Sequence, residues 1–172
     1  MKILKKILFT AYVVLFAVNA LQAQIRIAKA TPAQIAADKK FFQEAMKGKD
    51  FITEGLKKTP SGLLYRPAGP GSHKVAIAKK PAKFSKVKIS YSLFTIEDYT
   101  SKRKIIKHPN FEKPEVVPFD KLPYGLQEAI KMMNIGEEYL FYMPAKLAKN
   151  KYGDFAGGRA LSGMVDLVAA LP

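Results

Sequence analysis

Few side chains in this sequence can act as nucleophiles or metal ligands. Cysteine is absent, which excludes disulfides, thiolate zinc sites and a cysteine nucleophile. The only two histidines, His73 and His108, are far apart and have polar neighbours, so we expect both on the surface and no metal site. We therefore expect any activity of this chain to use no metal and no cofactor.

The chain is strongly basic. Lysine and arginine total 29 against 14 aspartates and glutamates, a formal net charge of +15. Such an excess suggests a nucleic acid, an anionic lipid or an acidic partner. The lysines are spread over every segment, however, and no RNP, zinc-finger or helix-turn-helix pattern occurs. A solvated basic surface is the favoured interpretation, and we expect no nucleic-acid partner.

The N-terminus has the pattern of a secretory signal, in which a basic start is followed by an apolar run over residues 7–18 and by small residues. We expect cleavage after Ala23, although cleavage after Ala20 is also acceptable. The apolar run is shorter than the roughly 20 residues needed to span a bilayer, so a cleaved signal over residues 1–23 is favoured over an uncleaved anchor. The mature protein is then exported to the periplasm or the medium, without stable membrane insertion.

Residues 24–58 are expected to form an extension with one helix. Thr31 is suited to the N-cap, Pro32 to the first helical position, and Gly48 follows the end. The expected apolar side consists of Ile35, Phe42, Ala45 and Met46. This side could cover the domain or pair with a second copy, so a monomer and a homodimer through this helix both stay open.

Residues 118–144 are expected to form a helix pressed onto a sheet. Apolar residues recur at helical spacing, at Leu122, Leu126, Ala129, Ile130 and Met133. Asn134 and Gly136 supply a left-handed stop. Residues 139–143 then have the pattern of a strand whose two faces are both largely covered.

Further strands are expected over residues 63–66, from Lys86 onward, over 102–107 and over 164–170. In the second of these, one side is expected to be buried and to carry Val87, Ile89, Tyr91 and Leu93. Residues 145–160 are expected to end in a mobile, glycine-rich surface loop. Because strands far apart in sequence surround one central helix, we expect an α+β fold over residues 59–172: an antiparallel sheet wrapped around one short helix, preceded by the N-terminal helix.

Residues 118–144 resemble the FKBP-type peptidyl-prolyl cis-trans isomerases. Eight positions of their signature fall in register without a gap: Pro118, Leu122, Gly125, Ile130, Met133, Gly136, Phe141 and Pro144. Residues 59–65, 87–92 and 164–167 resemble other strands of this family, so the resemblance covers nearly all of the chain after its extension. The exported layout is similar to that of macrophage-infectivity-potentiator-like proteins.

This resemblance implies a site for proline-containing or unfolded polypeptides. Carried over position by position, the site residues are Tyr91, Leu122, Leu126, Tyr152 and Val165. Prolyl isomerisation needs no nucleophile, because a dry apolar site that binds the twisted amide and stabilises its carbonyl is sufficient. Tyr91 is equally well explained as a core residue with a satisfied hydroxyl.

Four departures from the family pattern predict weak activity. No Phe-Asp pair occurs between Tyr99 and Val117, where Ile105 or Ile106 could replace only the apolar member. Leu126 stands for a tryptophan and Val165 for a phenylalanine. Pro123 replaces an isoleucine whose backbone N–H contacts ligand in the family, and proline has no N–H. A catalytically inactive binding or chaperone module is therefore the alternative.

Overall fold

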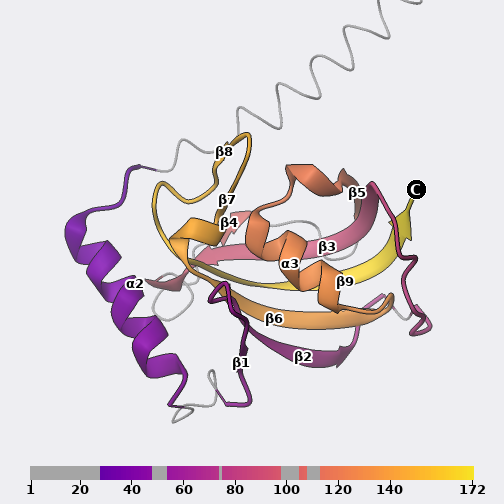
Figure 1. The fold of residues 1–172 in the computed structure, drawn as a ribbon, viewed down its shortest axis with the longest axis horizontal. Helices are drawn as coiled ribbons and strands as arrows, with labels where there is room; N and C mark the ends of the chain where they lie inside the picture. The colour runs from indigo at the N-terminus through magenta and orange to yellow at the C-terminus, as the bar shows by residue number, and fades with distance from the viewer. Residues whose placement is uncertain (1–27, 48–53, 74, 98–104, 108–112) are drawn as a thin grey trace, which may run out of the picture.

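The computed structural model describes residues 28–47, 54–73, 75–97, 105–107 and 113–172 (Figure 1). The predicted signal peptide, Gly48, His108 and residues 102–104 of the strand predicted over 102–107 lie outside these residues. The helices are α2 (Pro32–Ala45) and α3 (Tyr124–Met132), with short 3-10 turns η2 (Phe119–Lys121) and η3 (Ala145–Leu147). The strands are β1 (Lys57–Lys58), β2 (Leu64–Pro70), β3 (Lys86–Thr95), β4 (Ile105–Lys107), β5 (Glu115–Pro118), β6 (Glu137–Met143), β7 (Lys149–Asn150), β8 (Gly153–Asp154) and β9 (Leu161–Leu171).

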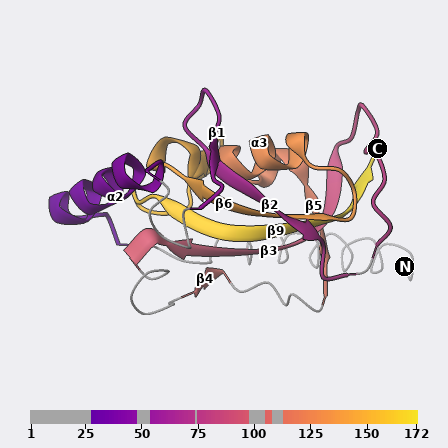
Figure 2. The same ribbon diagram turned by 90° about the horizontal axis from the view of Figure 1, so that it is seen from below.

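The predicted α+β architecture is confirmed. Seven strands form one antiparallel sheet in the order β1-β2-β6-β9-β3-β4, and β5 pairs with the start of β3. Helix α3 lies across one face of this sheet, over β6 and β9 (Figures 1 and 2). The hairpin β7–β8 forms a separate pair near η2 and the start of α3.

Alternation along β6 assigns its side chains to two cores, as the sequence predicts. Tyr139, Phe141 and Met143 belong to the core shared with α3. Leu140 and Tyr142 belong to a second core, which also contains Ala45 of α2 and Ile96. Both faces of this strand are therefore covered.

Two glycines within residues 118–144 are required by the structure around them. A Cβ at Gly125 would come within 2.8 Å of Met143 Cβ, so glycine lets α3 approach β6 closely. Gly136 has φ +84°, and a Cβ there would lie 2.6 Å from the carbonyl oxygen of Val75. Gly136 has the predicted left-handed conformation, which favours glycine, but it does not stop the helix: α3 ends at Met132 with Met133 extended, and Gly136 turns the chain into β6.

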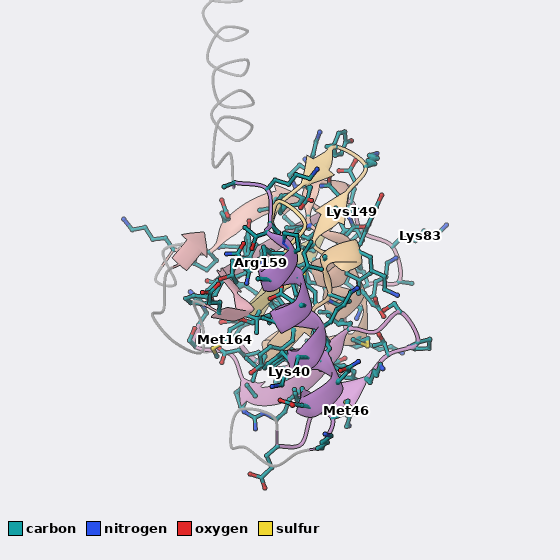
Figure 3. The ribbon with its side chains drawn as sticks, turned by 90° about the vertical axis from the view of Figure 1, so that its left-hand side faces the viewer. Lys40, Met46, Lys83, Lys149, Arg159 and Met164 are labelled. Atoms are coloured by element: carbon teal, nitrogen blue, oxygen red, sulfur yellow. The ribbon has the colours of Figure 1, made fainter. Side chains whose placement is uncertain are left out.

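Helix α2 begins as predicted but packs differently. Thr31 is its N-cap and forms a capping box with Gln34, while Pro32 occupies the first turn. The predicted apolar side is only partly correct, since Ile35 is 38% exposed and Met46 is 45% exposed. Figure 3 shows α2 across the end of the domain, with Met46 at the lower end of the helix. The helix covers the domain through Phe41, whose ring centroid lies 5.1 Å from that of Tyr142.

Three other expectations need correction. Ser90 and Ser92 of β3 are buried, so this strand is covered on both faces rather than on one. Strand β9 begins at Leu161, earlier than the sequence indicates. The glycine-rich segment before it is not a surface loop throughout, because its buried side chains include Ala156, Arg159 and Ala160.

Candidate functional site

Four of the five predicted site residues come together in the core beneath α3. Tyr91, Leu122, Leu126 and Val165 belong to one apolar cluster, and none of them is more than 5% exposed. Tyr91 and Val165 are direct partners in the β3–β9 register. Leu122 and Leu126 reach the same cluster from the segment that enters α3 and from its first turn.

Tyr152, the fifth residue, lies at the surface rather than in this cluster. It is 48% exposed, and its hydroxyl donates a hydrogen bond of 2.8 Å to Oδ2 of Asp120 on η2. The Nζ atom of Lys121 lies 3.3 Å from the centroid of the Tyr152 ring. Tyr152 therefore joins the loop between β7 and β8 to the segment that carries Leu122.

Asn150 positions this loop. Its buried Nδ2 donates to the carbonyl oxygens of Lys121, at 2.6 Å, and of Leu122, at 3.4 Å. Its Oδ1 accepts from the backbone N–H groups of Tyr152, at 2.7 Å, and Gly153, at 3.1 Å. One amide side chain thus fixes the backbone on both sides of the site.

At the exposed edge of the site, Asp120 contacts both Lys151 and Tyr152. Lys151 Nζ lies 2.9 Å from Asp120 Oδ2. The hydrogen bonds from Lys151 and Tyr152 hold the pKa of Asp120 below its ordinary value. The same contacts with Tyr152 and Asp120 raise the pKa of Lys151. Both groups are therefore ionised at neutral pH.

Pro123 is the residue at which the sequence predicts that a backbone N–H donor is missing. It is the N-cap of α3 and is buried, and its carbonyl accepts from the N–H of Gln127 at 3.0 Å. The Gln127 side chain in turn donates to the carbonyl of Leu122 at 2.8 Å. The entry to α3 is thus held by carbonyl acceptors and has no backbone donor at residue 123.

Comparisons with known proteins agree with this architecture. No family model matches the chain. The chain is 29% identical, over 122 residues and 68% of its length, to the FKBP-type peptidyl-prolyl cis-trans isomerase FkpA of Aeromonas hydrophila. It spans 42% of the length of that curated relative.

Solved structures give the fold. A peptidyl-prolyl cis-trans isomerase from Pseudomonas syringae matches 84% of this chain and 100% of its own, with a TM-score of 0.60 and 19% identity. FkpA from Escherichia coli matches 81% of this chain and 60% of its own, with a TM-score of 0.56 and 21% identity. This protein has the FKBP fold. The family resemblance predicted from the sequence is confirmed.

Within this FKBP fold, sequence reasoning missed three residues beside the site. Phe119 and Asp120 form a Phe-Asp pair on η2. This pair comes just after the stretch from Tyr99 to Val117, in which the family pattern predicts one. The Phe119 ring makes an edge contact with Phe84 at 4.9 Å between centroids. Asn150 gave no signal at all, because its role depends on backbone groups 28 and 29 residues away.

The expectation that His73 is a surface residue is wrong. Its side chain is 16% exposed, and Nδ1 lies 2.6 Å from Oδ2 of the buried Asp166. Its Nε2 lies 3.4 Å from the hydroxyl of Ser90. This order of serine, histidine and aspartate is that of an acyl-transfer triad, but Ser90 has no exposed surface and cannot meet a substrate. The cluster therefore holds residues 72–73 against the sheet.

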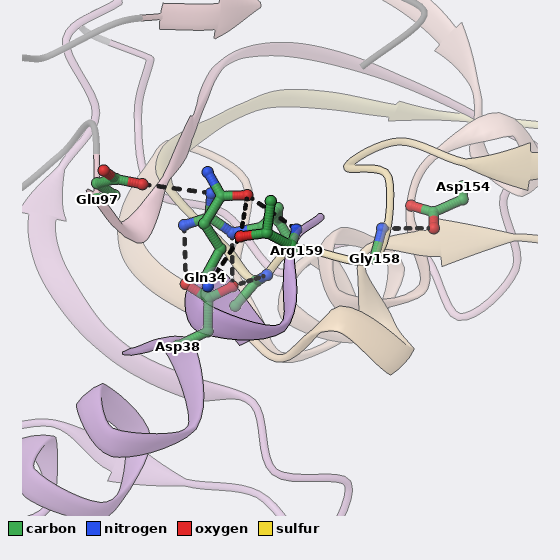
Figure 4. A network of polar contacts seen from close by, with 8 residues as sticks. Gln34, Asp38, Glu97, Asp154, Gly158 and Arg159 are labelled. Carbon is green, nitrogen blue, oxygen red and sulfur yellow. Dashed lines mark hydrogen bonds and ion pairs between the residues drawn. The ribbon is translucent and has the colours of Figure 1, made fainter. Parts of the chain in front are cut away.

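A second buried network attaches α2 to the segment before β9 (Figure 4). The Arg159 guanidinium donates to both carboxylate oxygens of Asp38, at 3.0 and 3.1 Å. The N–H of Ala160 donates to Asp38 Oδ2 at 2.8 Å, and Arg159 also contacts Glu97. Hydrogen bonding to Asp38 raises the pKa of Arg159.

The described residues also bear on metal sites and on membrane-spanning helices. No group of three or more histidine and carboxylate side chains there has the geometry to hold a metal ion. None of the helices in the described part of the chain is long and apolar enough to cross a membrane.

Proposed function

We propose that this protein is an exported FKBP-type peptidyl-prolyl cis-trans isomerase that assists the folding of envelope or secreted proteins. The observation that carries this proposal is the gathering of Tyr91, Leu122, Leu126 and Val165 in one apolar cluster next to the loop of Tyr152. The named activity of the Aeromonas hydrophila relative supports it.

The proposed mechanism uses apolar surroundings and hydrogen bonds alone. The prolyl ring packs on Leu126, between Tyr91 and Val165, after these buried side chains move apart. In this dry environment the amide loses resonance more easily than in water. Asp120 orients the hydroxyl of Tyr152 at the edge of this site.

The activity is expected to be weak for two structural reasons. The four core residues are at most 5% exposed, so opening the site costs packing contacts before substrate binds. Pro123 also removes a donor whose hydrogen bond would be worth about 1 kcal/mol.

The test is refolding of a client whose slow phase is proline isomerisation. We expect the wild type to accelerate this phase, and Tyr91→Phe to reduce the acceleration while keeping the core filled. Lys40→Ala, at an exposed position of α2, is the matched control and should act as the wild type does. A refolding rate equal to the uncatalysed one would contradict the proposal.

The alternative is a catalytically inactive binding or chaperone module. It is favoured by Pro123 and by the burial of the predicted site residues. It predicts that the protein suppresses aggregation of an unfolded client without accelerating proline isomerisation. The same refolding assay, combined with light scattering, distinguishes the two functions.

Export and oligomeric state complete the proposal. Cleavage near Ala23 would release the protein into the periplasm or the medium, which mass spectrometry of the mature N-terminus tests.

The exposed Ile35 and Met46 on α2 would support a homodimer, whereas docking of α2 onto the domain favours a monomer. Light scattering after gel filtration decides between them.

A further inference from the structure

The surface beside the proposed site carries three lysines around two aromatic rings. Lys121 Nζ and Lys151 Nζ lie 3.3 and 4.8 Å from the centroid of the Tyr152 ring. Lys131 Nζ on α3 lies 5.7 Å from the centroid of Phe119. We call these three lysines the basic rim. They come from η2, α3 and the β7–β8 loop, so the fold brings together charges that are separate in the sequence.

Among the described residues, only Lys151 of the basic rim has an ion-pair partner, although the charge of Asp120 also acts on Lys121. Asp120 pairs with Lys151 at 2.9 Å and accepts from Tyr152. Asp154 accepts from the backbone N–H groups of Ala156 and Gly158, both at 2.8 Å. Glu128 of α3 accepts from the hydroxyl of Ser61 at 2.6 Å. Over the described ranges, Lys121 and Lys131 form no ion pair with a carboxylate.

We infer that the site selects proline-containing polypeptide segments that carry acidic residues beside the proline. This inference rests on the proposed function and names its substrate class. Lys121 Nζ lies 3.3 Å from the centroid of the Tyr152 ring, so an ammonium group lies at the edge of the proposed prolyl site. An aspartate or glutamate of a bound segment would gain the attraction of Lys121 and Lys131. The net charge of +15 attracts the same segments over longer distances.

The geometry favours an acidic polypeptide over a nucleic acid. Single-stranded nucleic acids bind through bases that stack on open aromatic faces. One face of the Tyr152 ring is occupied by the Lys121 ammonium, 3.3 Å from the centroid. The Phe119 ring makes an edge contact with Phe84, and the Lys131 ammonium lies over it, 5.7 Å from the centroid. These rings therefore offer side-chain packing more readily than a platform for stacked bases.

The experiment uses three peptides that share one alanine-proline core and differ only in flanking glutamates, glutamines or lysines. NMR exchange spectroscopy gives kcat/KM for isomerisation, and fluorescence anisotropy gives binding. At low salt we expect the glutamate peptide to exceed the lysine peptide by about tenfold in kcat/KM and in affinity. High salt should bring this ratio close to one, because Lys131 is exposed to solvent and Lys121 is partly exposed.

The variant that tests the site combines Lys121→Gln with Lys131→Gln. It should lower the glutamate-to-lysine ratio by about threefold or more. The matched control combines Lys39→Gln with Lys40→Gln on α2, which removes the same charge from exposed positions and should keep the ratio. An equal loss in both double variants would overturn the inference, since the selectivity would then come from net charge alone.

The remaining outcomes separate this inference from the proposed function. Isomerisation of all three peptides at one rate, without preferential binding, overturns the inference and supports the isomerase. Preferential binding of the glutamate peptide without isomerisation supports the inference and overturns the isomerase. Loss of both preference and isomerisation overturns both. Displacement of the glutamate peptide by single-stranded DNA at lower concentration than by unlabelled peptide overturns the inference in favour of a nucleic-acid site.

Discussion

His73 Nδ1 lies 2.6 Å from Oδ2 of Asp166, on the face of the sheet turned away from α3. Asp166 is 1% exposed, and its other carboxylate oxygen has no hydrogen-bond partner among the described residues. The Ser72 hydroxyl and the His73 backbone N–H also donate to Oδ2, at 3.1 and 3.3 Å. The imidazole is thus the main side-chain partner of a buried carboxylate.

Replacing His73 should therefore destabilise the fold. We expect His73→Ala to lower the free energy of unfolding by about 3 kcal/mol, because it leaves a buried carboxylate without its side-chain partner. Urea denaturation measures this change. Ser72→Ala, which removes only one hydroxyl donor, is the control and should cost about 1 kcal/mol. Unfolding of His73→Ala at the wild-type urea concentration would show that the pair adds no stability.

Glu138 should make stability depend on pH. Burial, followed by the nearby charge of Asp166, raises its pKa above the ordinary value of 4.5, while His73 lowers it. The folded state thus holds this proton more tightly than the unfolded state. Its contribution is full below the ordinary pKa and is lost as pH rises through the raised one.

Glu138→Gln tests this pH dependence. We expect the variant to be more stable than the wild type at neutral pH, with the advantage vanishing below the ordinary glutamate pKa. Urea denaturation across this pH range measures it, with the exposed Glu44→Gln as the control. A Glu138→Gln variant that is less stable at neutral pH would contradict the burial argument.

Much of this architecture could be predicted from sequence, because the decisive patterns are local. The helical spacing of Leu126, Ala129 and Ile130 lies within α3, and the alternation lies within β6, so both elements are confirmed. Leu122 and Met133 flank the helix rather than belonging to it. The sequence gives no sign that Asp38 is buried, because its partner Arg159 is 121 residues away. The prediction that His73 lies at the surface is wrong for the same reason, because its partner Asp166 is 93 residues away. Polar residues buried by distant partners leave no periodic signal.

Asn150→Ala should impair both stability and the proposed activity. It removes donors and acceptors that fix the backbone of Lys121 and Tyr152, so we expect a loss of about 2 kcal/mol in unfolding free energy. If the loop forms the edge of the site, kcat/KM should also fall at temperatures where the variant is fully folded. Lys149→Ala, at the exposed neighbouring position, should leave both unchanged. Reduced stability with unchanged kcat/KM would mean that Asn150 supports the fold alone.

Pro123→Ala should raise the activity. The change restores a backbone N–H at the start of α3, and one added hydrogen bond of about 1 kcal/mol in the transition state corresponds to about a fivefold higher kcat/KM. Pro118→Ala, at an exposed position before η2, is the control for loss of a proline. An unchanged kcat/KM for Pro123→Ala would show that this position does not meet the substrate.

Docking of α2 should depend on Asp38. We expect Asp38→Ala to lower the free energy of unfolding by about 3 kcal/mol, because it leaves the buried Arg159 guanidinium without its bidentate partner. Lys40→Ala on the same helix should have little effect. Chemical denaturation followed by circular dichroism measures both. Equal stability of the two variants would mean that apolar contacts alone hold the helix.

The contact between Asp38 and Arg159 also sets an order of folding. Arg159 and Ala160 stand 121 and 122 residues after Asp38, near the end of the chain. On a chain that emerges N-terminus first, α2 has no partner for Asp38 until almost all of the domain has been made. A single helix of 14 residues is marginally stable in water, so α2 gains lasting structure only when its distant partners, Tyr142 of β6 and Arg159, are present. Closure of the Asp38–Arg159 contact thus requires that the chain has been made at least as far as the start of β9.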